Sequence, residues 1–170
     1  ANVFLVGCKP GDKKAATPGT FSDSDIAYLN EIAETIIPTT DTPGAKAAGV
    51  GAFMTVMVND CYDEKDQQVF FEGMKLLNEA SDKKFKKPFM DIDPAQRKAL
   101  LTEIDAEAKE YMAKKKAGDP KHYFRMMKEL TLLGYFTSEI GATQALRYVA
   151  VPGKYEGCIP YKKGDRAWAT

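Results

Sequence analysis

Few residues in this sequence are of the types that carry out acid–base, nucleophilic or metal chemistry. The 170 residues include one histidine, His122, and three cysteines, Cys8, Cys61 and Cys158. An isolated histidine is more often a surface or helix-capping residue than a ligand or a general base. Neither the CxxCH motif of haem attachment nor the GxGxxG motif of dinucleotide binding occurs. This inventory predicts a chain with no catalytic, cofactor-binding or metal-binding residues of its own.

Cys8 ends a short pattern that is typical of bacterial lipoproteins. Leu5, Val6 and Gly7 supply the aliphatic and small residues that precede a lipidated cysteine. Residues 9–20 are rich in Gly, Pro, Lys, Thr and Ala, which is the composition of a flexible linker. We therefore expect residues 1–20 to be a signal remnant followed by a linker. Cys8 is expected to carry a lipid that anchors the protein to a bacterial membrane on the periplasmic side.

The other two cysteines are candidates for a disulfide. In an oxidising compartment, a bond between Cys61 and Cys158 would pin the C-terminal tail to the rest of the domain, and closing so long a loop stabilises a fold by several kcal/mol (about 3–5). In a reducing compartment both residues would be free thiols. The sequence leaves both possibilities open.

The length and composition are those of one globular domain. Hydrophobic residues make up 44% of the chain, and 24 basic residues balance 24 acidic ones. A net charge of zero gives no general attraction to nucleic acid, so no nucleic-acid partner is expected. No apolar run approaches the roughly 20 residues that cross a bilayer.

The periodicity of apolar residues predicts an all-α, bundle-like domain over residues 21–170 with about five helices. Ser22 and Asp25 form a capping-box pattern at the first helix, and Asp93 followed by Pro94 starts the fourth. Leu76 and Leu133 are among the expected core residues. The helices are expected at 22–37, 42–61, 64–81, 93–117 and 120–148, and residues 149–170 are too rich in Gly, Pro and polar residues to continue the last one.

Two features suggest a surface that binds another protein. Small residues, including Gly134, Ser138 and Gly141, recur at three- and four-residue spacing on the last helix. They either pack against a helix of the same domain or form a docking groove. The irregular tail carries aromatic residues that either fold back on the domain or contact a partner, among them Tyr155, Tyr161 and Trp168.

Several stretches resemble the gluconate 2-dehydrogenase subunit 3 family. They are "EIAETIIPTTDTPGA", the most specific, then "MVNDCY", "QQVFFEGMKLLNEAS", "ELTLLGYFTSEIG" and "PGKYEGCIP", so that the resemblance runs from Phe21 to Trp168. It implies a small accessory subunit whose partner is a large flavoprotein of the glucose-methanol-choline (GMC) type that holds FAD. It also implies a cytochrome c subunit that holds haem c, and a twin-arginine export signal upstream of Ala1.

The resemblance and the poor inventory of reactive residues lead to the same prediction. The chain is expected to bind, stabilise and localise a periplasmic FAD-dependent sugar or polyol dehydrogenase, without catalysis of its own. Two alternatives remain. One is a free-standing enzyme that uses His122 with carboxylates, and the other is a structural lipoprotein with no redox partner.

Overall fold

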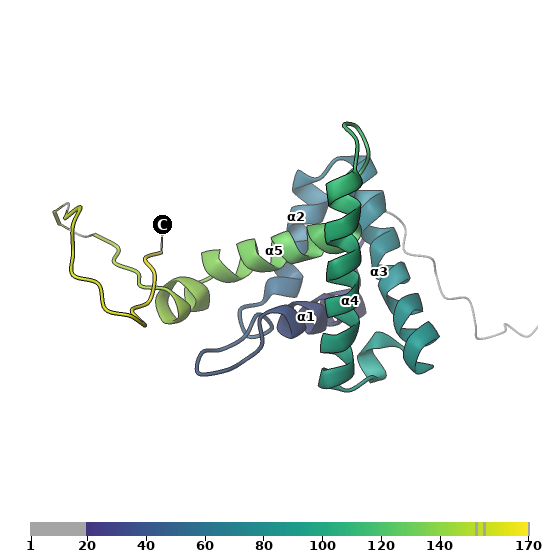
Figure 1. Ribbon diagram of the computed structural model, residues 1–170, viewed down its shortest axis with the longest axis horizontal. Helices are drawn as coiled ribbons and strands as arrows, with labels where there is room; N and C mark the ends of the chain where they lie inside the picture. Colours follow the sequence, from purple (N-terminus) through teal and green to yellow (C-terminus); the bar gives the residue numbers. More distant parts are fainter. Residues whose placement is uncertain (1–19, 152, 155, 170) are drawn as a thin grey trace, which may run out of the picture.

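The computed structural model describes residues 20–151, 153–154 and 156–169, and within them the protein is all-α (Figure 1). Its five α-helices and two short helical turns carry the fold, and the one β-type contact is an isolated bridge between Arg147 and Trp168. This confirms the predicted fold class. The elements are α1 (Asp23–Ile36), α2 (Val50–Cys61), α3 (Glu64–Phe85), the 3₁₀ turn η1 (Phe89–Asp91), α4 (Pro94–Lys114), α5 (Tyr123–Thr137) and the π-helical turn η2 (Gly141–Ala145).

Local capping signals define the first and fourth helices as expected. The Ser22 hydroxyl accepts the backbone N–H of Asp25, whose carboxylate accepts the N–H of Ser22 in return. Asp93 and Gln96 form the same reciprocal pair at α4. These caps satisfy backbone donors that have no partner inside a helix.

The second helix begins later than its sequence suggests. The prediction placed its start at Thr42 and Pro43, but α2 begins at Val50 after a series of turns. Gly49 precedes it with a φ of 69°, a left-handed conformation that glycine adopts at little cost. The side chain of Glu34 holds the preceding loop, since its carboxylate accepts the backbone N–H groups of Thr39 and Lys46. The Lys46 N–H is therefore not available to a helical turn that starts at Thr42.

The last helix is broken, whereas the sequence predicted one helix to residue 148. α5 ends at Thr137, and Ser138 is extended, with ψ of 159°. The Ser138 hydroxyl donates to the Tyr135 carbonyl (2.6 Å) and accepts the backbone N–H of Gly141 (3.0 Å), so it serves the end of one segment and the start of the next. Gly141 packs so closely that an added Cβ would lie 1.8 Å from the Tyr135 carbonyl oxygen. The π-helical turn η2 follows.

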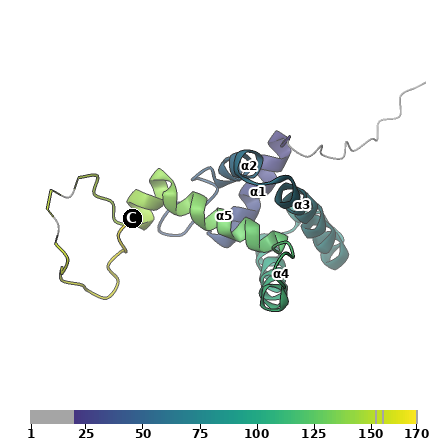
Figure 2. The same ribbon diagram turned by 90° about the horizontal axis from the view of Figure 1, so that it is seen from above.

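The core lies where α1, α2 and α5 meet, with α3 and α4 packed on either side of α5 (Figure 2). α4 packs on α1 and α5 rather than on α3, so α3 and α4 diverge. Leu76 on α3 and Leu133 on α5 were expected in the core but are 42% and 46% exposed, because no helix of the described residues covers their faces. None of the helices in the described residues is both long enough and apolar enough to cross a membrane. The main buried side chains are Leu29, Ile32, Met54, Val58, Phe70, Leu77, Phe89, Phe124, Met127 and Leu130.

Candidate partner-binding arm

The described residues of the segment 146–169 (146–151, 153–154 and 156–169) form a loop that extends from the end of η2, away from the helical bundle (Figures 1 and 2). We call this segment the C-terminal arm. Its two ends meet at a neck, where the N–H of Arg147 donates to the Ala167 carbonyl (2.8 Å) and the N–H of Ala169 donates to the Arg147 carbonyl (2.9 Å). The guanidinium carbon of Arg147 lies 4.2 Å from the centroid of the Trp168 ring, within cation–π range. The arm is therefore a closed loop.

Arg166 fastens the neck to η2. Its guanidinium donates to the carbonyls of Thr143 (3.2 Å) and Gln144 (2.6 Å), at the end of this helical turn. Terminal carbonyls lack partners within their own helix, so a cationic donor there is favourable. Neither arginine was predicted from the sequence, although an arginine at each end of an irregular tail is a weak signal for such a contact.

The loop forms an apolar cavity of about 610 Å³ that is open to solvent. Trp168 at the neck forms part of its wall, and the ion pair between Lys154 and Glu156 (2.7 Å) lies at its polar side. The walls are formed by Val149, Val151, Gly153, Lys154, Glu156, Ile159 and Trp168. An apolar cavity with few polar groups is typical of a site that receives a side chain or a small apolar group.

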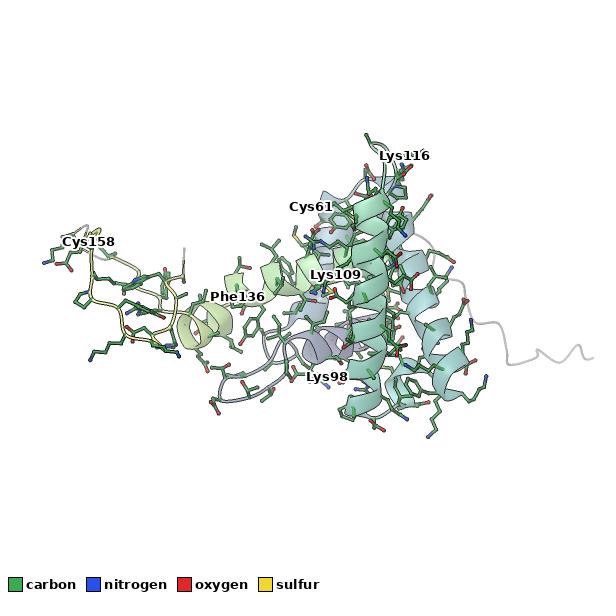
Figure 3. The ribbon with its side chains drawn as sticks, in the orientation of Figure 1. Cys61, Lys98, Lys109, Lys116, Phe136 and Cys158 are labelled. Carbon is green, nitrogen blue, oxygen red and sulfur yellow. The ribbon has the colours of Figure 1, made fainter. Side chains whose placement is uncertain are left out.

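Large apolar side chains are exposed along the arm and on the adjoining part of α5. Val151 is 82% exposed and Tyr161 is 73% exposed. On α5, Leu132, Leu133 and Phe136 are each about two-fifths exposed, and Phe136 lies where α5 leaves the bundle (Figure 3). Several large exposed apolar side chains on neighbouring segments are a feature of interaction sites. The sequence signal was the stretch "TLLGYF", which has more apolar residues than one buried face of a helix accommodates.

The small residues of the last helix do not form a docking groove. Gly134 is buried against α2, and an added Cβ there would lie 2.6 Å from the Phe53 ring. Gly141 is buried against Tyr135, and Ser138 is half-buried at the break after α5. Of the two alternatives for these residues, the structure therefore shows packing against other parts of the same domain. Of the predicted tail residues, Tyr161 and Trp168 are exposed, and Tyr155 lies outside the described residues.

The structure contradicts the candidate disulfide. Cys61 and Cys158 are both free and exposed. Cys61 ends α2, whereas Cys158 lies in the arm, far from it across the molecule (Figure 3). The arm continues away from the bundle instead of folding back over α2, so the two thiols lie apart in this structure. Cys8 and the linker lie outside the described residues, and lipidation at Cys8 stays a prediction.

His122 has a structural role at the start of α5. Its Nδ1 accepts the backbone N–H of Phe124 (3.2 Å), and its ring stacks on Tyr123 with centroids 4.5 Å apart. Burial lowers the pKa of His122, although the negative charge of Glu107 opposes this shift. No carboxylate in the described part of the chain hydrogen-bonds to His122, and no cluster of three metal-ligating side chains occurs there. This geometry fits a helix cap and gives the enzyme alternative no catalytic pair.

Residues 23–153 match the family model of gluconate 2-dehydrogenase subunit 3. The chain belongs to the gluconate 2-dehydrogenase subunit 3 family. Neither a curated protein nor a solved structure matches it. The match ends at Gly153, earlier than the resemblance to Trp168 suggested, so most of the C-terminal arm follows the matched region. The family is that of a subunit of a dehydrogenase, which makes the chain an accessory component of an oxidoreductase complex.

Proposed function

We propose that this protein binds, stabilises and localises the large flavoprotein subunit of an FAD-dependent sugar or polyol dehydrogenase, and that the C-terminal arm is its main contact. The observation that carries the proposal is the arm itself: a closed, projecting loop with exposed apolar side chains and a large apolar cavity. Ordering such a loop costs conformational entropy, and leaving its apolar surface in water recovers little of that cost. A partner that covers the arm and Phe136 would supply the missing burial.

The charges of the arm indicate the nature of the partner surface. Five basic residues in the arm face only two acidic ones, in a chain whose overall charge is zero. Arg147 and Arg166 hold the neck, which leaves Lys162 and Lys163 on the exposed side. We expect the partner to present an apolar patch with acidic groups at its edge, since complementary charges steer association and fix orientation.

In this proposal the redox chemistry belongs to other chains. The GMC-type flavoprotein would hold FAD and accept the hydride of the substrate, and a cytochrome subunit with haem c would take the electrons. The described residues of this chain contribute contacts, and they contain no cluster suited to a metal ion. The family membership supports the subunit role.

The cellular location is proposed from the sequence. A lipid on Cys8 would tether the complex to a bacterial membrane in the periplasm, with residues 9–20 as the spacer. Co-export of the folded flavoprotein with this chain would require a twin-arginine signal upstream of Ala1. A mass measurement on the protein purified from its native membrane tests the lipid, because a diacylglycerol on Cys8 adds a defined mass.

Co-purification with the flavoprotein tests the contact. The tagged protein should retain a flavin-containing polypeptide, detected by the absorbance of FAD. Val151→Asp, which places a charge in the apolar wall of the cavity, should reduce retention about tenfold or more, whereas Met90→Asp should not. Met90 is a matched control because it is an exposed apolar residue on the bundle, in η1.

Three results would contradict the proposal. Retention of the flavoprotein by Val151→Asp at the level of the unchanged protein would remove the arm from the interface. Oxidation of sugars by the purified chain alone, with a dye as acceptor, would favour the enzyme alternative. Failure of the unchanged protein to retain any flavoprotein would favour the structural lipoprotein.

A further inference from the structure

A second cavity lies at the other end of α5 and is lined by residues of α3 and α4. These two helices diverge (Figure 2). It has a volume of about 510 Å³ and is open to solvent. It is lined by Lys121, His122 and Tyr123 at the start of α5, and by residues of α3 and of α4. We call it the α3/α4 groove. α5 has 15 residues, so the groove lies about 22 Å from the start of the break that leads to the C-terminal arm.

The surface of the α3/α4 groove is largely aromatic and aliphatic. Tyr111 of α4 and the His122 ring have centroids 5.6 Å apart, and His122 stacks on Tyr123. Leu76 faces them from α3. Leu76 is 42% exposed and Tyr111 is 38% exposed, so the groove offers apolar area that no element of this chain covers in the described residues.

Negative charges flank this apolar surface on both sides. Glu72 lies on α3, where Lys75 pairs with it at 3.4 Å, and Glu107 lies on α4. Glu107 makes no ion pair or hydrogen bond within the described residues, yet its charge contributes to raising the pKa of Tyr123 to about 12, after the larger effect of burial. The charge of Glu107 therefore acts on the rings of the groove. Lys121, the one basic residue at the edge, is engaged by Glu129 at 3.2 Å.

The apolar rings and the carboxylates of the α3/α4 groove together indicate which class of ligand it binds. An anion would be repelled by Glu107, and a purely apolar group would remove water from this carboxylate without giving it a partner. A small inorganic cation would leave Leu76 and Tyr111 uncovered. Lysine and arginine have an aliphatic stem and a charged end, and both cations interact favourably with aromatic faces.

We propose that the α3/α4 groove binds a lysine or arginine side chain of a protein partner, with the charge at Glu107 and the aliphatic stem against Tyr111 and Leu76. This site is separate from the C-terminal arm, and a chain bound there need not be the flavoprotein. It does not depend on the proposed function, so either can fail without the other.

His122 provides a specific reporter for this site, because it is the single histidine of the sequence. The full chain is titrated with the peptide acetyl-Leu-Arg-Leu-amide while the ring-proton resonances of His122 are followed by NMR. A second peptide contains citrulline, a neutral analogue of arginine with nearly the same shape. We expect a saturable shift with the arginine peptide and a dissociation constant about three- to fivefold weaker with the citrulline peptide, as befits a charge pair near the surface.

Variants of α4 connect the shift to the groove. Glu107→Gln should weaken binding of the arginine peptide about three- to fivefold and leave binding of the citrulline peptide unchanged. Tyr111→Ala should weaken both peptides. Glu110→Gln is the matched control, because Glu110 is also on α4 but pairs with Lys114 and does not line the groove. Circular dichroism confirms that each variant keeps its helices.

Three outcomes overturn the proposal. The first is the absence of saturation up to about 1 mM arginine peptide, which corresponds to binding weaker than about −4 kcal/mol. The second is equal affinity for the arginine and citrulline peptides. The third is equal binding of the arginine peptide by Glu107→Gln and by the unchanged protein.

Discussion

The carboxylate of Glu34, on α1, accepts a hydrogen bond from the backbone N–H of Lys46 at 2.9 Å, across the loop that leads to α2. The same carboxylate accepts the N–H and the hydroxyl of Thr39. Gly44 lies against it so closely that an added Cβ would be 2.4 Å from a carboxylate oxygen. This network explains why the most specific stretch of the family resemblance, "EIAETIIPTTDTPGA", combines an acid, threonines and a Pro-Gly pair.

Replacement of Glu34 by glutamine should destabilise the protein by about 1–3 kcal/mol. Glutamine keeps the size of the side chain but presents an NH₂ group to a backbone N–H, and two donors cannot pair. Chemical denaturation with urea, followed by circular dichroism, measures the change in unfolding free energy. Glu110→Gln should cost less than about 0.5 kcal/mol, because the exposed ion pair of Glu110 with Lys114 contributes little. Equal effects of the two substitutions would contradict the anchoring role of Glu34.

Stability should fall as the pH drops below about 6.5, because of His122. Burial holds the pKa of this histidine below its ordinary value of 6.5, so the unfolded chain binds the proton more tightly than the folded one. The contribution is complete above pH 6.5 and is lost as the pH falls through the lower pKa of the folded state. Protonation of Nδ1 also removes the acceptor for the Phe124 N–H. A capping hydrogen bond of this kind typically contributes about 1 kcal/mol.

The control for this prediction is His122→Asn. Asparagine caps helices well and does not titrate, so this variant should show a flatter unfolding free energy between pH 7 and pH 5. Urea denaturation at intervals of pH compares the two proteins. The same slope in both would show that other groups cause the dependence.

The fold was predictable wherever short-range signals decide the structure. Ser22 and Asp93 cap helices through residues three positions away, so both starts follow from the sequence. The start of α2 does not, because Glu34 captures backbone groups of the next loop and overrides the signal of Pro43. Leu76 shows a further limit: its helical spacing is that of a core residue, but α4 diverges from α3 and leaves it uncovered.

The candidate sites depended even more on long-range contacts. The tail was expected to be irregular from its composition, but the neck pairs Arg147 with Trp168 across the whole loop, and no local pattern predicts such a contact. The spacing of small residues around Gly134 is visible in the sequence. The sequence does not show that Gly134 packs on Phe53 of α2, and this contact shows that the small residues serve internal packing rather than docking.

Gly134→Ala should therefore destabilise the protein by about 1–2 kcal/mol. Alanine favours a helix over glycine by about 1 kcal/mol, so the sign of the effect reports whether Phe53 blocks the added Cβ. In a Phe53→Ala background the same substitution should be neutral or stabilising. Thermal or urea denaturation of the four proteins gives a double-mutant cycle. Stabilisation by Gly134→Ala alone would show that the glycine does not pack on α2.

The contact between Arg147 and Trp168 at the neck of the C-terminal arm can be tested by fluorescence. Trp168 is the single tryptophan of the sequence, so its fluorescence reports the state of the arm. Arg147→Ala removes the cation that lies 4.2 Å from the ring centroid, and we expect a red-shifted emission and stronger quenching by acrylamide. The unfolding free energy should change by less than about 0.5 kcal/mol, because the arm lies outside the core.

Lys154→Ala is the matched control, since Lys154 lies in the arm but pairs with Glu156 and not with Trp168. It should leave the fluorescence unchanged. The emission shift and the quenching of Arg147→Lys should be intermediate between those of Arg147→Ala and the unchanged protein. Lysine keeps the charge but loses the planar contact with the indole. If Arg147→Ala leaves both emission and quenching unchanged, the backbone bridge alone closes the neck. The cation–π contact would then contribute nothing to the shape that the arm presents to a partner.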